Sequence, residues 1–309
     1  MKANQHILIT GTTGFVGSAL LPALSQHHQT RPITRTEFGD LLPTTDYTAA
    51  LTHADVVIHL AARVHVMQDT ATDPLAAFRN TNTAGTLNLA RQAAAAGVRS
   101  FIFLSSIKVN GEHTTASNPF TTDDTHIPTD SYGISKYEAE QGLRELAVQT
   151  GMEVVIIRPP LVYGPGVKAN FLSMMRWLHK GIPLPLGAIH NQRSLVALDN
   201  LVDLITTCID HPAAANQTFL VSDGEDLSTT ELLQRLSHAL GKPARLLPIP
   251  QSWLETALTL VGKRAIAQRL CGNLQVDISK TRDLLGWTPP LSVDEALRQT
   301  AQAYLQNQR

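Results

Sequence analysis

The stretch HILITGTTGFVGSALL, residues 6–21, decides the fold class of this chain. It begins as a short apolar run of strand type, ends in a helix-like segment, and carries Gly11, Gly14 and Gly17 where the two meet. In a dinucleotide-binding turn, the first glycine allows a sharp turn, the second lets the backbone approach a pyrophosphate, and the third lets the helix lie close to the sheet. The spacing therefore predicts a strand, a tight turn and a helix whose free N–H groups face phosphates.

The first half of the chain continues this alternation of strands and helices. The predicted strands are residues 6–10, 30–34, 55–60, 100–104 and 153–158, and the predicted helices are residues 15–28, 73–96 and 132–150. Such alternation predicts parallel strands joined by right-handed helical crossovers. The strands are apolar throughout, as expected when helices cover both faces of a sheet. We therefore predict an α/β fold with a Rossmann doubly wound parallel sheet.

Beyond residue 158 the sequence becomes richer in proline and glycine. Predicted helices 201–210, 229–240 and 293–306 are interleaved there with short strands at 194–197 and 218–221. We expect residues 1–165 to form an NAD(P)-binding Rossmann domain, to which later segments return. Residues 166–309 are expected to form mainly a smaller, mixed α/β substrate-binding part at the carboxyl ends of the strands, where open α/β sheets bind ligands.

Composition narrows the class of protein. The 309 residues carry a formal net charge of −1, which argues against nucleic acid as a partner. The two cysteines show no metal-ligand spacing, and neither do the aspartates Asp123, Asp124, Asp199 and Asp203, so we expect no metal site. Sparse cysteine usage indicates a reducing, cytoplasmic setting. No apolar run has the length of a membrane span, so we expect no membrane partner.

The end of the second strand is where Rossmann proteins usually select their cofactor. An acid there binds the 2′-hydroxyl of the adenosine ribose, whereas a basic residue accepts a 2′-phosphate. No acid occupies this place, and Arg35 is the candidate. We therefore expect NADP(H), with NAD(H) as the alternative; an exposed arginine without a ligand role is the structural alternative.

A possible reaction centre follows from YGISK at residues 132–136. Tyr132 and Lys136 stand four residues apart on a predicted helix and so lie on one face. A lysine ammonium near a phenol stabilises the phenolate, which lets the tyrosine act as general acid or base. The strand at 100–104 leads into Ser106, whose hydroxyl would reach the same edge of the sheet and bind the reacting oxygen.

Together these motifs resemble those of the extended short-chain dehydrogenase/reductases, the NAD-dependent epimerase/dehydratase family of nucleotide-sugar enzymes. The resemblance covers essentially the whole chain. It rests on TGTTGFVG at 10–17, HLAA at 59–62, NTAGT at 82–86, FLSS at 103–106, YGISK at 132–136, RPPLVYGPG at 158–166 and DISKTRDLLGW at 277–287. It implies that Ser106, Tyr132 and Lys136 are catalytic, and that Lys136 also holds the nicotinamide ribose.

The resemblance also implies contacts with cofactor and substrate. The implied cofactor contacts are Gly11, Thr13, Gly14, Phe15, Val16, Gly17, Arg35, Leu60, Ala61, Ala62, Asn82, Ser105, Tyr132, Lys136 and Pro159. The implied substrate contacts are Lys108, Asn170 and Arg193, since a guanidinium suits a diphosphate. For Arg193 a surface ion pair is the alternative. Leu161 stands where the family often has an asparagine, which removes one expected diphosphate contact.

A narrower resemblance concerns SSIKVNGE at 105–112, which is similar to 4-ketoreductases and epimerases of surface-polysaccharide (O-antigen) pathways. Ile107 and Lys108 stand where 4,6-dehydratases carry an acid pair, so dehydration is not expected. The first hypothesis is NADPH-dependent reduction of a UDP-4-keto-6-deoxy-N-acetylhexosamine. The second is an NAD-dependent 4-epimerase of a UDP-hexose or UDP-N-acetylhexosamine. The third, a non-catalytic NAD(P)-binding regulator, fits poorly with an intact Ser–Tyr–Lys set.

The resemblance further implies a homodimer that forms through the helices at 73–96 and 132–150. Two histidines near the predicted cofactor edge have different expected roles. We expect His59 to be a buried, hydrogen-bonded side chain rather than a catalyst. For His65, contact with substrate is the functional alternative.

Overall fold

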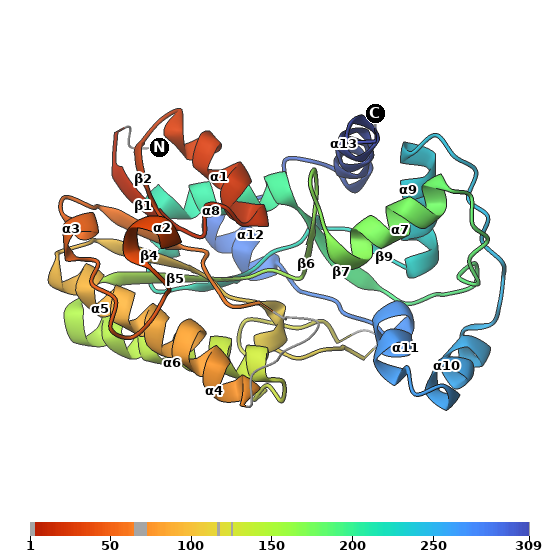
Figure 1. Ribbon diagram of the computed structural model, residues 1–309, viewed down its shortest axis with the longest axis horizontal. Coiled ribbons are helices and arrows are strands. Elements are labelled where there is room, and N and C mark those ends of the chain that lie inside the picture. The colour runs from red at the N-terminus through yellow and green to blue at the C-terminus, as the bar shows by residue number, and fades with distance from the viewer. Residues whose placement is uncertain (1–3, 65–72, 116–117, 125, 309) are drawn as a thin grey trace.

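The main sheet contains six parallel strands in the order β2-β1-β3-β4-β5-β8 (Figure 1). The computed structural model describes residues 4–64, 73–115, 118–124 and 126–308. The strands are β1 (His6–Thr10), β2 (Gln29–Ile33), β3 (Val56–His59), β4 (Ser100–Leu104), β5 (Glu153–Arg158) and β8 (Thr218–Leu220). The chain moves outward from β1 to β2 and then returns to the other side of β1 with β3. Such a reversal opens a ligand crevice at the carboxyl ends of β1 and β3.

Helices cover both faces of this sheet. The helical segments are α1 (Phe15–Ser25), α2 (Arg35–Phe38), α3 (Thr48–Leu51), α4 (Pro74–Phe78), η1 (Arg79–Gly85), α5 (Thr86–Ala95), η2 (Ile107–Val109), α6 (Ser131–Thr150), α7 (Ala169–His179), α8 (Leu198–Asp210), η3 (Pro212–Ala214), α9 (Thr229–Ala239), α10 (Gln251–Leu260), α11 (Arg264–Cys271), α12 (Ser279–Leu285) and α13 (Val293–Gln306). Along β1, Ile7 and Ile9 pack into a core with α1 and α8, whereas Leu8 packs into a second core with α5 and α6. Burial from both sides explains the apolar runs in the inner strands β1, β3, β4 and β5. The edge strand β2 (QTRPI) is only partly buried, so the expectation that every strand is apolar is wrong there.

A smaller sheet begins where the chain leaves β5. It has the order β6-β7-β9, with β6 (Leu161–Tyr163) parallel to β7 (Arg193–Ala197) and β9 (Asp226–Leu227) antiparallel to β7. Side chains of α7, α9 and α13 form a separate core with it, and Figure 1 shows this part at the opposite end of the molecule from β2. Between β7 and β9 the chain returns to the main sheet with α8 and β8.

The predicted Rossmann fold is confirmed, and most strand bounds agree within two residues. The prediction of one helix over 73–96 is wrong in detail, because the segment consists of α4, the π-helix η1 and α5. A π-helical turn widens the helix locally and often occurs at functional sites. Here it contains Asn82, which is fully buried. Within the described part of the chain, no helix combines the length and hydropathy needed to cross a bilayer.

Candidate active site

The glycine loop joins β1 to α1 and has room for backbone only. Gly11 has a φ of +74°, and a Cβ there would lie 2.7 Å from the backbone nitrogen of Ala61. A Cβ on Gly17 would collide with the carbonyl oxygen of Gly11 and lie 2.7 Å from the Cα of Thr12. No side chain caps the N-terminus of α1 and no acid lies in its first turn, so its N–H groups can bind an anion. This cradle fits the pyrophosphate of a dinucleotide.

The HLAA segment is held against this loop by a short hydrogen-bond chain. The hydroxyl of Thr10 accepts from the backbone nitrogen of Ala61 at 3.1 Å and lies 2.7 Å from Nδ1 of His59. Nε2 of His59 lies 2.9 Å from the hydroxyl of Thr86. Burial, with a smaller contribution from Lys136, lowers the pKa of His59 to about 3. His59 is therefore a neutral, buried and hydrogen-bonded side chain, as the sequence predicted. It holds the Thr10 hydroxyl that contacts Ala61.

Asn82 connects this segment to the reaction centre. Its Oδ1 accepts from the backbone nitrogen of Arg63 at 2.8 Å, and its Nδ2 donates to the carbonyl of Arg63 and to the hydroxyl of Ser135. Ser135 in turn donates to the carbonyl oxygen of Tyr132 at 2.8 Å. The carboxamide of Asn82 thus connects the segment that follows β3 to the start of α6 through hydrogen bonds.

The three predicted catalytic side chains meet at the carboxyl end of β4. Ser106 is the second residue after β4, while Tyr132 and Lys136 lie in the first two turns of α6. The Ser106 side chain lies close enough to the phenol of Tyr132 to oppose the rise in its pKa. The ammonium of Lys136 donates to the carbonyl of Leu104 at 2.8 Å and lies 4.3 Å from the ring centre of Phe103. The geometry therefore brings the Ser–Tyr–Lys set together.

Gly133 allows this close approach. A Cβ at that position would lie 2.9 Å from the Cβ of Pro128 and 3.2 Å from the carbonyl oxygen of Lys108. Asp130 caps α6 by accepting from the Gly133 nitrogen at 3.1 Å. The start of α6 can therefore press against η2, which places Tyr132 beside Ser106.

Burial opposes the charged forms of both Lys136 and Tyr132. It lowers the pKa of Lys136 to about 7, and the nearby Glu140 carboxylate counteracts this shift. Burial raises the pKa of Tyr132 to about 12, the charge of Asp130 adds to the rise, and the hydrogen bond with Ser106 opposes it. Both shifts disfavour the charged forms, so between about pH 7 and 12 the two side chains hold one titratable proton between them.

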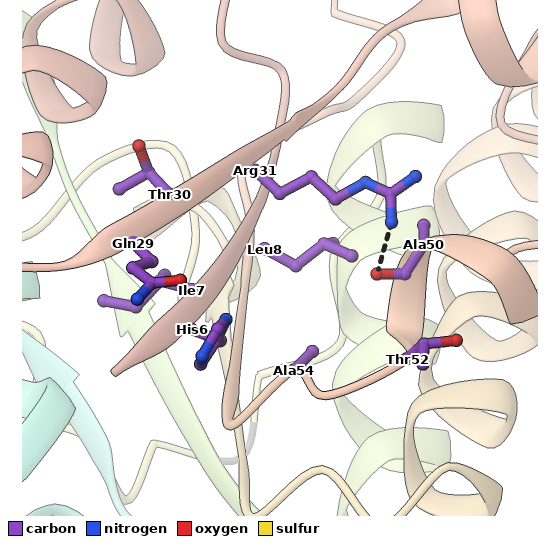
Figure 2. A pocket seen from close by; sticks show the side chains of 9 residues that line it. All are labelled: His6, Ile7, Leu8, Gln29, Thr30, Arg31, Ala50, Thr52 and Ala54. Atoms are coloured by element: carbon purple, nitrogen blue, oxygen red, sulfur yellow. Dashed lines mark hydrogen bonds between the residues drawn. The ribbon is translucent and has the colours of Figure 1, made fainter. Parts of the chain in front are cut away.

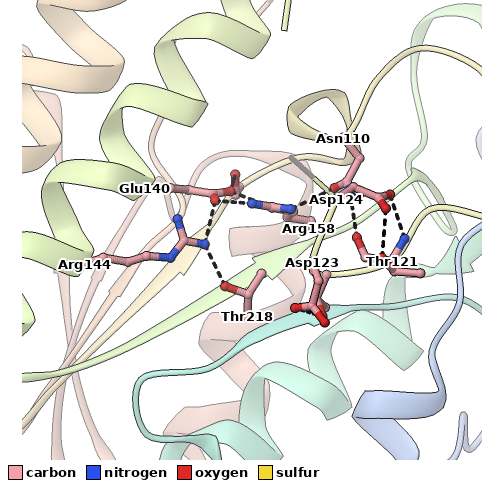
Figure 3. A network of polar contacts seen from close by, with 10 residues as sticks. Asn110, Thr121, Asp123, Asp124, Glu140, Arg144, Arg158 and Thr218 are labelled. Carbon is pink, nitrogen blue, oxygen red and sulfur yellow. Dashed lines mark hydrogen bonds and ion pairs between the residues drawn. The ribbon is translucent and has the colours of Figure 1, made fainter. Parts of the chain in front are cut away.

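A buried ionic network supports this centre from below (Figure 3). The carboxylate of Glu140 accepts from Nε and Nη2 of Arg158 at 2.9 and 2.6 Å, from the hydroxyl of Ser105 at 2.5 Å, and from Arg144 at 3.1 Å. Arg158 also donates to Oδ1 of Asn110 at 3.0 Å. Glu140 lies one turn beyond Lys136 on α6, so the network joins that helix to the ends of β4 and β5.

The sequence reasoning assigned no role to this network. The sequence does contain one sign of it: Arg158 follows four apolar residues at the end of β5, and a buried guanidinium needs an anionic partner. The packing of α6 on the sheet determines that Glu140, among the acids of the chain, is that partner. Ser105, predicted as a cofactor contact, turns its hydroxyl into the network toward Glu140.

Comparison with known proteins agrees with this geometry. Residues 7–222 match the model of the NAD dependent epimerase/dehydratase family. The chain belongs to this family. It is 53% identical to "UDP-glucose 4-epimerase" of Vibrio cholerae, over 99% of this chain and 97% of the relative. This family contains enzymes that act on nucleotide-linked sugars, and the chain is such an enzyme.

Solved structures share the fold of this chain. The structure of RMD from Pseudomonas aeruginosa complexed with NADPH matches with a TM-score of 0.77 and 23% identity, over 97% of this chain and 99% of that chain. UDP-glucuronic acid 4-epimerase from Bacillus cereus in complex with NAD matches with a TM-score of 0.78 and 20% identity, over 99% and 100%. The fold thus accommodates either dinucleotide, so it does not select between them.

In this family member, the position of the dehydratase acid pair is occupied by structural residues. Ile107 is buried in the core, and the ammonium of Lys108 lies 3.1 Å from Asp130 and 3.3 Å from Glu112. Lys108, predicted to bind substrate, therefore neutralises the carboxylate that caps α6. The other predicted cofactor residues lie along the crevice: Thr13 and Gly14 are exposed, while Phe15, Val16, Leu60, Ala61 and Ala62 are half-buried.

The two remaining substrate candidates lie in the smaller part. Arg193 is the first residue of β7, whose Leu195 pairs with Leu161 of β6. The Nη1 of Arg193 donates to the carbonyl of Gly272 at 3.0 Å. Burial lowers the pKa of Arg193. Asn170 lies exposed in the first turn of α7. The carbonyl of Pro159, a predicted cofactor contact, accepts from the nitrogen of Ile107 at 3.0 Å.

Arg35 lies just beyond the end of β2, as expected for a residue that meets the adenosine ribose. Its Nε lies 3.0 Å from Asp40, and both side chains are largely exposed. Exposed pairs of this kind contribute only about 0–1 kcal/mol, so either charge is free to meet a ligand. The end of β2 thus presents a guanidinium and a carboxylate side by side.

Two cavities lie away from the catalytic side chains. One of about 160 Å³ lies between the N-terminal halves of β1 and β2 and residues 50–54, at the edge opposite the glycine loop (Figure 2). The other, of about 370 Å³, lies between residues 113–114 and α10–α11. Neither is lined by Ser106, Tyr132 or Lys136. His65, for which a substrate contact was considered, lies outside the described residues.

Proposed function

We propose that this enzyme is an NAD-dependent 4-epimerase of a UDP-hexose or UDP-N-acetylhexosamine. The observation that carries the proposal is the 53% identity, over nearly the full length of both chains, with a relative named UDP-glucose 4-epimerase. The intact Ser106, Tyr132 and Lys136 set supports it. The reductase hypothesis, placed first on sequence grounds, has less support, because it rested mainly on Arg35 and the short run at 105–112.

The chemistry follows from the residues of the site. A bound nicotinamide would supply a reversible hydride acceptor beside the sugar C4. Tyr132 takes the proton from the C4 hydroxyl and later returns it. Ser106 hydrogen-bonds the same oxygen and stabilises the charge that develops there. Lys136 favours the phenolate form of Tyr132 by its charge.

Epimerisation needs no net oxidant, so the enzyme would retain its cofactor through the cycle. We propose NAD as that cofactor, with Asp40 near the ribose hydroxyls and Arg35 turned to solvent. NADP(H) remains the second candidate because Arg35 lies at the end of β2. We propose that Arg193 and Asn170 contact the diphosphate of the substrate. We also propose that the enzyme forms a homodimer through α5 and α6. The proposed location is the cytoplasm.

The test combines turnover with cofactor analysis. Purified protein is incubated with UDP-glucose or with UDP-N-acetylglucosamine, and the C4 epimer is followed by proton NMR without added cofactor. We expect conversion toward equilibrium, with NAD released on denaturation. A Tyr132→Phe variant serves as control and should convert neither sugar. The absence of any epimer with the NAD-replete enzyme would exclude the epimerase.

The reductase remains as the second function, favoured by the position of Arg35. Its test uses an enzymatically prepared UDP-4-keto-6-deoxy-N-acetylhexosamine with NADPH, and follows the loss of the reduced nicotinamide absorbance. Stoichiometric consumption by an enzyme that fails to epimerise UDP-sugars would replace the epimerase proposal with this one.

A further inference from the structure

The helix pair α10–α11, with the loop before it, exposes an apolar face that no part of the described chain covers. No residue of α10 is buried. Its Leu254 packs toward the core of the smaller part, while Trp253, Ala257 and Leu260 point outward with the spacing of one helix face. Trp253 is 70% exposed and Leu260 82% exposed, and the exposed Val261 extends the strip. Soluble surfaces seldom expose contiguous apolar strips of this kind.

Positive charge accompanies this strip. Residues 242–269 contain five basic side chains and one acid, a net charge of +4 in a chain whose total is −1. The basic residues are Lys242, Arg245, Lys263, Arg264 and Arg269. Glu255, which accepts from Gln251 on its own helix, and Arg264 both line the inner cavity, so their charges face inward together. The exposed Lys263 and Arg269 supply the positive charge of the helix pair outside that cavity. The outer face is thus both apolar and cationic.

The inner face of the pair has a separate role. It walls the cavity of about 370 Å³ through Glu255 and Gln268, and Gln268 lies 3.0 Å from Nδ1 of His113 across that cavity. The cavity reaches Gly272, whose carbonyl holds Arg193. Figure 1 shows α10 and α11 at an outer corner of the molecule, below the smaller sheet. The outer face can therefore meet a large partner without changing the catalytic centre.

We propose that the outer face of α10–α11 docks on an anionic membrane surface. Tryptophan and leucine enter the lipid interface, and lysine and arginine at the border of an apolar face bind acidic headgroups. A second copy of this chain fits less well, because a two-fold contact would bring the same cationic patch against itself. Docking would hold the substrate-binding part close to the lipid.

Vesicle sedimentation tests this with the full-length, cofactor-bound enzyme. We expect binding to phosphatidylcholine vesicles that contain phosphatidylglycerol, weaker binding to pure phosphatidylcholine, and loss of binding as salt rises. The double variants Trp253→Ser/Leu260→Ser and Lys263→Gln/Arg269→Gln should each weaken binding by roughly tenfold or more. Their activity on soluble UDP-sugar should stay unchanged, which also shows that they fold.

Trp177→Ser is the matched control, since Trp177 is a half-exposed tryptophan on α7. It should bind vesicles like the wild type. In a Trp177→Phe background the buried Trp287 contributes a constant emission, so a shift to shorter wavelength when vesicles are added reports on the exposed Trp253. Absence of wild-type binding, or an equal loss in Trp177→Ser, would overturn the proposal. An oligomer that dissociates in Trp253→Ser/Leu260→Ser, without vesicle binding, would assign the face to self-association instead.

Discussion

At the proposed reaction centre, burial disfavours the ammonium form of Lys136 and the phenolate form of Tyr132, although proton transfer requires those forms. Burial holds the pKa of Lys136 at about 7 and raises that of Tyr132 to about 12. A phenolate–ammonium pair, however, holds the same number of protons as a phenol–amine pair. The two residues therefore titrate jointly, and the state with one shared proton spans the range between those values. Near neutral pH this is the state that can take a proton from a sugar hydroxyl.

The joint titration predicts how the rate of the proposed epimerase depends on pH. Below a pH of about 7 the pair holds two protons and cannot act as a base. The rate should therefore rise as pH increases through about 7 and then level off. In Lys136→Met the plateau should disappear, and the rate should keep rising with pH because Tyr132 must ionise alone. The pH profile of kcat/KM measures this, and an unchanged plateau in the variant would contradict it.

Replacing Tyr132 tests its role as the proton carrier. Tyr132→Phe keeps the ring that packs edge-on against Phe78 but removes the hydroxyl. We expect kcat to fall by about 10²–10⁴-fold, the usual contribution of general acid–base catalysis, with little change in NAD content. Turnover and the absorbance of released NAD give both quantities. Activity within about tenfold of wild type would mean that another group carries the proton.

At the scale of elements, α6 is held in place by the buried network around Glu140. Glu140→Gln leaves the guanidinium of Arg158 without its anionic partner in the core. Breaking a buried ion pair in this way costs about 3–5 kcal/mol of unfolding free energy. Removing the carboxylate should also lower the pKa of Lys136, because Glu140 raises it. The rising limb of the pH profile should then move to lower pH.

Glu138→Gln is the matched control on the same helix. Glu138 pairs with Arg79 at the surface, so its loss should cost at most about 1 kcal/mol. Urea unfolding of both variants measures the difference. Equal losses would show that the buried network contributes no more than a surface pair.

The glycine loop allows a second comparison between neighbouring positions. Gly17→Ala forces a methyl group into the backbone of the turn, so we expect lower thermal stability together with loss of bound NAD. Gly14→Ala meets only the Gly11 carbonyl, at 3.1 Å, and should fold normally. Its methyl group borders the anion-binding helix end and should weaken NAD binding by about 1–3 kcal/mol. Calorimetry with NAD distinguishes the two; a stable Gly17→Ala with full affinity would contradict the cradle.

At the scale of the whole molecule, stability should depend on the cofactor. A ligand that binds only the folded state stabilises it by about 2.7 kcal/mol at a hundred times its Kd. Protein stripped of NAD should therefore melt roughly 5 °C or more below the replenished enzyme. Differential scanning calorimetry with NAD and NADP in parallel measures this and also ranks the two cofactors. No shift with either dinucleotide would contradict the assignment of the crevice.

The sequence by itself determined the Rossmann sheet, because its evidence is local. Strand-type apolar runs, the Gly11–Gly17 spacing and the four-residue step from Tyr132 to Lys136 are each readable within a short window. The same is true of the missing dehydratase acids, since Ile107 and Lys108 follow Ser106 directly. The resemblance to the epimerase/dehydratase family also rests on these local features.

Only the tertiary structure decided which polar groups meet. Glu140 and Arg158 are separated by 18 residues, and Lys108 and Asp130 by 22, so no short pattern pairs them. The π-helical turn that buries Asn82 and the uncovered face of α10 likewise depend on packing. The physical reason is that hydrogen bonds and burial act through space, whereas a sequence pattern records only neighbours along the chain.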